Sequence, residues 1–260
     1  MEEVVFNGGQ RRRYQKGERP IIFPRRDVPP AEIVPGIPLE IHPKFREFGY
    51  QSMFDINEFI PGVTAKMVDW FWANMEKGYH LWAPGEHYGF DWIVAPCDVG
   101  YEGSKEASYE FDPTSPIVIT RINMKYYPFT ECYEHCWISC FGEEQPQDGF
   151  LIHMYEDTEN GILWRSIGVE TEASIKAYME KMKKKMEEEG PNAAPRPNVQ
   201  DHMAYESATL NLFLPQLYAL WENHPDPWEN VQFDLTTEKN EDGTWRHKYP
   251  NLPPKREDYE

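Results

Sequence analysis

The chain has 260 residues, of which 40% are hydrophobic and 15% aromatic, so it can bury a sizeable core and is not a disordered segment. Its formal net charge of -18 argues against nucleic acid and anionic membrane surfaces as partners, because both attract proteins of the opposite charge. No apolar run approaches the ~20 residues of a transmembrane helix, and residues 1–5 do not begin a secretory signal, so we expect a cytoplasmic protein.

The N-terminal segment is rich in proline, carries a basic Arg11-Arg12-Arg13 run and lacks a sustained hydrophobic period. This composition predicts an extended arm over residues 1–48 that wraps a body over residues 49–222. Residues 223–260 are expected to form a C-terminal tail. We therefore expect a single domain.

The first predicted helix spans residues 63–75, where apolar side chains recur at helical spacing. These side chains are Val63, Met67, Trp70, Phe71 and Met75. We expect Trp70 and Trp72 to pack in the core or at an interface and not to form an aromatic cage, since aromatic stripes usually serve packing.

Short strand-like runs follow this helix. They cover residues 88–94, 106–111, 117–127, 136–141, 150–156 and 162–169. Glu159-Asn160-Gly161 lies between the last two runs and predicts a hairpin, because Asn-Gly tolerates positive φ at both turn positions. The pattern indicates an antiparallel meander.

Two helices are predicted after the strands, over residues 171–189 and 199–221, with a Pro-rich linker at 190–198 between them. The first helix is expected to turn four apolar side chains inward: Ile175, Met179, Met182 and Met186. Pro215 predicts a kink in the second helix. Strands followed by a long C-terminal helix predict an α+β fold in which the sheet curls round that helix.

His202 and Glu206 are four residues apart at the start of the last predicted helix, so both lie on one helical face. An imidazole and a carboxylate on one face suit a metal ion, although two ligands alone do not hold one. His87 stands at the start of the first strand and is a further candidate. For a single histidine, however, a hydrogen-bonded structural role is the more frequent one.

Glu110 is the fourth candidate. Period-two alternation places Tyr109 and Phe111 on one strand face and Glu106 and Glu110 on the other. If the glutamate face is solvent-exposed, Glu110 is a surface charge, and if it is concave, the buried carboxylate requires a cation. The spacing leaves both possibilities open.

Three cysteines recur at every fourth residue, at Cys132, Cys136 and Cys140. This is not the spacing of the common iron–sulfur motifs, and their aromatic and aliphatic neighbours indicate a buried strand, where a free cysteine behaves as a small hydrophobe. His135 precedes Cys136 directly, so the two side chains point to opposite strand faces, which argues against a catalytic thiol.

Four stretches occur in an order that resembles the 2,4-diacetylphloroglucinol hydrolase and phloretin hydrolase family. They are GYHLWAPGEHYGFDW at 78–92, GSKEASYEF at 103–111, FLIHMYEDTENGILWRS at 150–166 and HMAYE at 202–206. The likeness extends over residues 65–222, and its most specific elements are the Tyr79-to-His87 spacing and the helical His-x-x-x-Glu. Members of this family cleave the carbon–carbon bond between a polyhydroxylated ring and an acyl group. Their fold is a helix grip, a curved antiparallel sheet around a long C-terminal helix.

The resemblance implies four ligands for one zinc ion per chain: His87, Glu110, His202 and Glu206. Glu106 is the alternative to Glu110. By the same resemblance, Tyr79 would hydrogen-bond the substrate and His153 would act in proton transfer. An imidazole suits that role because it titrates near the working pH.

The implied function is therefore that of a zinc-dependent hydrolase that splits an acylated polyphenol into a phenol and a carboxylic acid, and the implied assembly is a homodimer. Ligand type alone does not separate zinc from iron, manganese or cobalt. Two other functions stay open: a non-haem iron enzyme acting on phenolics, and a non-catalytic carrier of hydrophobic small molecules. The carrier predicts neither a metal nor turnover.

Overall fold

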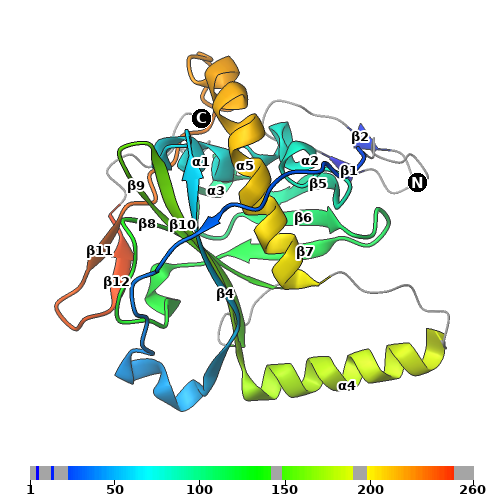
Figure 1. Ribbon diagram of the computed structural model, residues 1–260, viewed down its shortest axis with the longest axis vertical. Coiled ribbons are helices and arrows are strands. Elements are labelled where there is room, and N and C mark those ends of the chain that lie inside the picture. Colours follow the sequence, from blue (N-terminus) through cyan, green and yellow to red (C-terminus); the bar gives the residue numbers. More distant parts are fainter. Residues whose placement is uncertain (1–3, 6–12, 15–22, 142–147, 190–197, 249–260) are drawn as a thin grey trace.

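The structure is a computed structural model that describes residues 4–5, 13–14, 23–141, 148–189 and 198–248. Its main feature is an eight-stranded antiparallel sheet with the strand order β3-β4-β10-β9-β8-β7-β6-β5. The long helix α5 crosses one face of this sheet (Figure 1). The chain is therefore an α+β protein, as the sequence predicts.

The strands of the sheet are β3 (Glu32–Ile33), β4 (Tyr50–Pro61), β5 (His87–Val94), β6 (Lys105–Glu110), β7 (Ile117–Arg121), β8 (His135–Phe141), β9 (Gly149–Asp157) and β10 (Gly161–Thr171). The helices are α1 (Ala65–Ala73), α2 (Tyr79–Trp82), α3 (Pro96–Val99), α4 (Glu172–Glu189) and α5 (Val199–Trp221). Three 3-10 helices are η1 (Pro43–Phe48), η2 (Met75–Lys77) and η3 (Met124–Tyr126). Two small sheets pair β1 (Val4–Val5) with β2 (Arg13–Tyr14) and β11 (Thr237–Lys239) with β12 (Trp245–His247).

All six predicted strands are present, but the run at 117–127 is strand only as far as Arg121, because the chain then turns into η3. Strand β4 was not predicted although it has 12 residues. Asn57 and Glu58 lie buried in its middle and interrupt the alternation of apolar and polar residues by which a strand is recognised. Strand β3 of the main sheet lies within residues 1–48, which the sequence predicts as an arm, and it pairs with β4.

The β9–β10 hairpin confirms the turn predicted at residues 159–161, but for a different reason. Neither Asn160 nor Gly161 has a positive φ. Gly161 is instead needed because a Cβ atom there would collide with the backbone carbonyl of Ile60 on the neighbouring strand β4. The glycine therefore permits close pairing and not an unusual turn conformation.

Helix α4 extends away from the sheet, which corrects the predicted inward face (Figure 1). Met179 is 62% exposed and its neighbour Tyr178 is 52% exposed, whereas Ile175 is half-buried. The side chains of Met182 and Met186, like linker residues 190–197, lie outside the described part of the chain. The periodicity predicted the helix correctly, but it does not say whether an apolar face has a partner.

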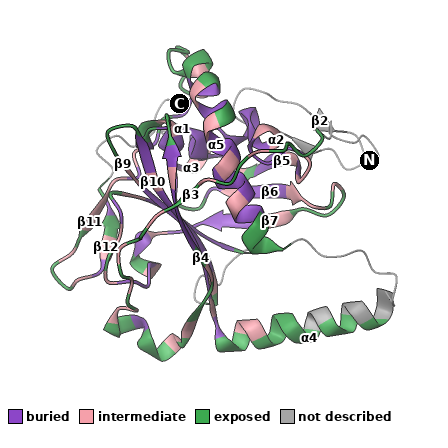
Figure 2. Ribbon diagram, in the orientation of Figure 1, coloured by how far each residue is buried: buried purple, intermediate pink, exposed green. Residues whose placement is uncertain are grey.

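The larger of two core clusters lies between the sheet and helices α1 and α5. Figure 2 shows buried residues along most of the strands and on both helices. The Phe71 ring of α1 packs edge-to-face on Phe213 of α5 at 5.3 Å, and Trp70 packs likewise on Tyr218 at 5.5 Å. This packing turns the N-terminal half of α5 toward β5 and β6. Within the described residues, the helices are too short or too polar to cross a membrane.

The segment after α5 is part of the body and not a loose tail over its described length. Val231, Phe233 and Leu235 are buried in the main core. The backbone N–H of Cys136 donates to the Leu235 carbonyl at 3.1 Å, and Nε2 of His247 on β12 donates to the Cys136 carbonyl at 2.7 Å. The segment therefore ties the β11–β12 hairpin to strand β8.

His247 makes the stability of the fold depend on pH. Burial lowers the pKa of its imidazole from 6.5 to about 4, so between these values the unfolded chain binds more protons than the folded one. Stability should therefore fall as the pH drops from 6.5 to 4, with a contribution from His247 of about 3 kcal/mol. Urea denaturation across this range, with chelator present, measures the slope. His247→Asn should make it shallower, and equal slopes for the two proteins would contradict this assignment.

Candidate metal centre

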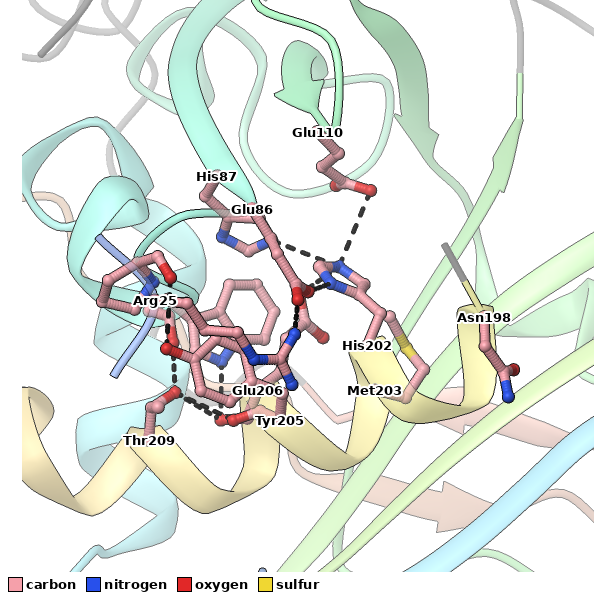
Figure 3. A network of polar contacts seen from close by, with 12 residues as sticks. Arg25, Glu86, His87, Glu110, Asn198, His202, Met203, Tyr205, Glu206 and Thr209 are labelled. Carbon is pink, nitrogen blue, oxygen red and sulfur yellow. Dashed lines mark hydrogen bonds and ion pairs between the residues drawn. The ribbon is translucent and has the colours of Figure 1, made fainter. Parts of the chain in front are cut away.

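Four side chains from three elements converge beside the N-terminal half of α5 (Figure 3). His87 is the first residue of β5 and Glu110 is the last residue of β6, and the two are direct partners in the strand register. His202 and Glu206 come from α5, where their spacing places both on the face that meets these strands. The structure thus brings together the four residues that the resemblance implies as ligands.

The donor atoms of these residues lie close together. Oε1 of Glu206 is 3.0 Å from Nε2 of His87 and 3.3 Å from Nε2 of His202. The two Nε2 atoms are 3.3 Å apart, and Oε2 of Glu110 lies 3.8 Å from Nε2 of His202. His87, Glu110 and His202 form a buried group that could hold a metal ion.

Each imidazole is oriented through its other nitrogen. Nδ1 of His87 donates to the backbone carbonyl of Tyr79 at 3.0 Å, and Nδ1 of His202 donates to Oε2 of Glu86 at 2.6 Å. When Nδ1 of each ring carries the proton, the lone pair of each Nε2 is available to a cation. The two Nε2 atoms lie 3.3 Å apart, which fits two ligands of one metal ion.

The carboxylate of Glu206 also fits a cation site. Burial raises the pKa of its carboxyl, but the charge of His202 and hydrogen bonds from both histidines outweigh this effect and lower the pKa to about 2. The group is therefore an anion at neutral pH. Its Oε2 atom is buried and accepts no hydrogen bond from the described residues, and a bound cation would satisfy this oxygen.

Both strand glutamates, Glu106 and Glu110, line a cavity, but they have different partners. Glu106 is fully buried and forms an ion pair with Nη2 of Arg121 at 2.7 Å. Glu110 is half-buried, and its Oε1 accepts a hydrogen bond from the Tyr79 hydroxyl at 2.5 Å. Glu110 therefore lies at the centre, whereas the charge of Glu106 is balanced elsewhere.

Phe111 does not continue the predicted alternation. Its φ of 61° ends β6 directly after Glu110, and its N–H donates to the Glu86 carbonyl at 2.9 Å. Its ring packs edge-to-face on His202 at 4.6 Å, and so lies on the side of Glu110 and not with Tyr109. A left-handed conformation in a bulky residue is costly, and such strain gathers at functional sites.

Three of the four donors, Glu110, His202 and Glu206, line a cavity whose other walls are mostly apolar and aromatic. The lining includes Phe54, Trp72, Met75, Trp82, Trp137 and Leu151. Trp70 packs in the core, as predicted for both tryptophans of α1, and its Nε1 donates to Oδ1 of Asn230 at 2.5 Å. Trp72 is also buried, but its ring belongs to the cavity wall. An apolar cavity with a few converging polar groups is the usual form of a small-molecule site.

His153 lies in the same cavity, buried among tryptophans. Its ring stacks on Trp72 at 5.2 Å and on Trp164 at 5.0 Å, and its Nδ1 is 2.9 Å from Oγ of Ser166. Burial lowers the pKa of His153 to about 4, so the ring is neutral at pH 7. The expectation that it titrates near the working pH is wrong, because desolvation disfavours the charged imidazole.

Tyr79 lines the cavity next to His87 and Glu110. Its ring stacks flat on His87 at 4.0 Å and 1°, and its hydroxyl donates to Glu110. Burial and the charge of Glu110 raise the pKa of Tyr79 well above its ordinary value. The phenol therefore stays protonated and serves as a hydrogen-bond donor at the edge of the cavity.

The cysteines have no part in this centre. Cys136 and Cys140 are free thiols buried in β8, and Cys132 is free and half-buried. His135 turns away from Cys136 and places Nδ1 2.9 Å from Oδ2 of Asp69. The predicted separation of this imidazole from the thiol is confirmed.

Glu86 was missed by sequence reasoning, although it stands directly before His87. Its Oε2 accepts from His202, and its Oε1 forms an ion pair with Arg25 of the N-terminal arm (Figure 3). Glu86 contacts His202, which lies 116 residues further along the chain. A contact over such a separation leaves no recognisable spacing pattern in the sequence. Only the fold reveals this contact.

Comparison with known proteins gives no family assignment. The chain matches no protein-family model, and no curated protein is significantly similar to it in sequence. Protein Ms6760 from Mycobacterium smegmatis is a solved structure with 14% identity and a TM-score of 0.34, over 70% of this chain and 96% of that chain. A protein from Arthrobacter aurescens, solved by NMR, has 18% identity and a TM-score of 0.36, over 73% of this chain and 98% of that chain. At these TM-scores neither likeness bears on the fold or the function.

Proposed function

We propose that the chain is a zinc-dependent hydrolase that cleaves the carbon–carbon bond between a polyhydroxylated aromatic ring and its acyl group, as in phloretin or diacetylphloroglucinol. The products are a phenol and a carboxylic acid. The observation that carries this proposal is the convergence of the Nε2 atoms of His87 and His202 on the Glu206 carboxylate, which lines an aromatic cavity that also holds His153. The resemblance in sequence supports the same reaction, a helix-grip fold with α5 as the gripped helix, and a homodimer.

His87, Glu110, His202 and Glu206 would hold the zinc ion. When bound, zinc supplies a Lewis acid that polarises a carbonyl or lowers the pKa of water towards ~7. Two nitrogen and two carboxylate donors suit this ion, and the two carboxylates balance its charge within a buried site. The same donors also suit Fe(II), which makes the iron enzyme the alternative.

The cavity residues would bind and orient the substrate. The tryptophan rings provide flat apolar surfaces for the aromatic ring and exclude water from it. Tyr79 would donate a hydrogen bond to a phenolic oxygen, as it now does to Glu110. This contact would place the acyl carbonyl beside the proposed zinc ligands.

His153 would move the proton that bond cleavage requires. Its Nδ1 is engaged with Ser166, which leaves Nε2 for proton exchange. The neutral ring can take the proton released when water adds to the carbonyl and pass it to the ring carbon as the carbon–carbon bond breaks. His153 would thus carry one proton from the attacking water to the ring carbon.

The test is incubation of the zinc-loaded protein with phloretin under nitrogen, followed by chromatography. Equal amounts of phloroglucinol and the arylpropanoic acid are expected. Cleavage that requires dioxygen and iron would favour the oxygenase instead. Tight binding of phloretin without metal or turnover would favour the carrier.

Tyr79→Phe should bind zinc more weakly, because its hydroxyl is an outer partner of Glu110, and at saturating zinc it should still lose substrate binding energy. The loss of one hydrogen bond in a buried site should lower kcat/KM by roughly 10- to 100-fold. Steady-state kinetics together with elemental analysis of the same sample measure both quantities. An unchanged kcat/KM would remove Tyr79 from the substrate site.

A further inference from the structure

The N-terminal arm reaches the outer side of the metal centre through residues 23–26, which we call the strap. Phe23 stacks on the ring of His80 at 5.4 Å and 18°. The guanidinium of Arg25 lies 4.0 Å from the centroid of the Tyr205 ring, and the N–H of Arg26 donates to the Tyr205 hydroxyl at 2.9 Å. The strap thus contacts α5 at Tyr205, the residue directly before the proposed ligand Glu206.

Arg25 connects the strap to a ligand through a single carboxylate. Its guanidinium pairs with Oε1 of Glu86, and the other oxygen of Glu86 accepts from Nδ1 of His202 at 2.6 Å. Figure 3 shows this series of contacts from Arg25 through Glu86 to His202. A carboxylate that accepts from Nδ1 fixes the ring orientation and tautomer of a metal-binding histidine, so that Nε2 faces the ion.

Gly85 provides an independent sign that the strap is closely seated. Its φ is +87°, and a Cβ atom at this position would lie 2.5 Å from the backbone N and 2.9 Å from Cα of Arg25. Both colliding atoms belong to the backbone, so a side chain on residue 85 could be accommodated only by moving the strap. The loop that carries Glu86 and His87 is therefore shaped to receive the arm.

We propose that Arg25 is a positioning residue of the metal centre: by holding Glu86 it keeps His202 aligned for the ion, and the seated strap slows metal release. This inference rests on the metal site of the proposed function, but not on the reaction. It gives the N-terminal arm a role within its own chain.

The test is the rate at which zinc leaves the loaded, full-length protein in excess chelator. Loss of an outer partner of a ligand changes metal affinity about 10–100-fold, and Arg25 acts one contact further out, so Arg25→Gln should speed release roughly three- to tenfold. The side chain of Arg25 is 53% exposed, so this change leaves the core intact. Arg25→Lys retains the charge and should restore slow release.

Three further variants sharpen the test. Gly85→Ala should also speed release, because a Cβ atom at this positive-φ position strains the loop that carries Glu86 and His87 and displaces the strap. Arg26→Gln is the matched control and should release zinc at the wild-type rate, since its side chain forms no ion pair with the described residues. In a Glu86→Ala background, Arg25→Gln should have no further effect, because Arg25 acts through that carboxylate.

The outcomes separate this inference from the proposed function. Wild-type protein that retains no zinc would overturn the metal centre and the strap together. Zinc-loaded wild-type protein whose Arg25→Gln variant releases the ion at the same rate would overturn the strap alone. Equal acceleration by Arg25→Gln and Arg26→Gln would also overturn it, since a general loosening of the arm would then explain the effect.

Discussion

Replacing His202 by alanine is expected to abolish both metal retention and cleavage. The Nε2 atom of His202 lies 3.3 Å from both the Glu206 carboxylate and Nε2 of His87, so its loss removes a donor from the middle of the group. The carboxylates of Glu110 and Glu206 would then lack the His202 imidazole as a partner. Their unpaired burial destabilises the site. Activity should fall by at least on the order of 10²–10³, the loss that follows removal of one strong electrostatic contact to a transition state.

Elemental mass spectrometry and product analysis on the same preparation measure both effects of His202→Ala. His224→Ala is a suitable control, since that histidine is exposed just beyond the end of α5. The control should retain zinc and full activity. Full metal content and an unchanged rate in His202→Ala would disprove the proposed metal centre.

Replacing His153 by phenylalanine is expected to separate metal binding from catalysis. The new ring retains the stacking on Trp72 and Trp164 and fills the buried position, but it cannot exchange a proton. Zinc content should therefore stay at the wild-type level while kcat falls by about 10²–10⁴, the usual contribution of general acid–base catalysis.

A thermal melt should accompany the kinetics of His153→Phe, because the lost contact to Ser166 could also affect folding. A variant that melts like wild type and turns over at the wild-type rate would show that His153 is a packing residue. Loss of zinc in this variant would instead place His153 among the ligands.

Much of the scaffold could be predicted because its signals are local. The bounds of α5, 199–221, follow from helical spacing and from its start just after the Pro-rich segment, and this helix alone places His202 and Glu206 together. Strand spacing predicted β5 and β6, whose pairing brings His87 opposite Glu110. Strand β4 was not predicted, because Asn57 and Glu58 are polar and so indicate a surface position, although both are buried.

The properties of the site that depend on distant contacts could not be predicted. The neutral state of His153 follows from its burial among tryptophans of α1, β8 and β10. Glu106 forms an ion pair with Arg121 across the β6–β7 pair, whereas Glu110 lies in the group that could hold a metal ion. The backbone of Phe111 breaks the alternation assumed for β6.

The most direct test of the central claim is elemental mass spectrometry on protein purified without chelator and then dialysed against metal-free buffer. Four converging donors predict about one zinc ion per chain, retained through dialysis. A protein that holds no metal, even after reconstitution with zinc, would contradict the account.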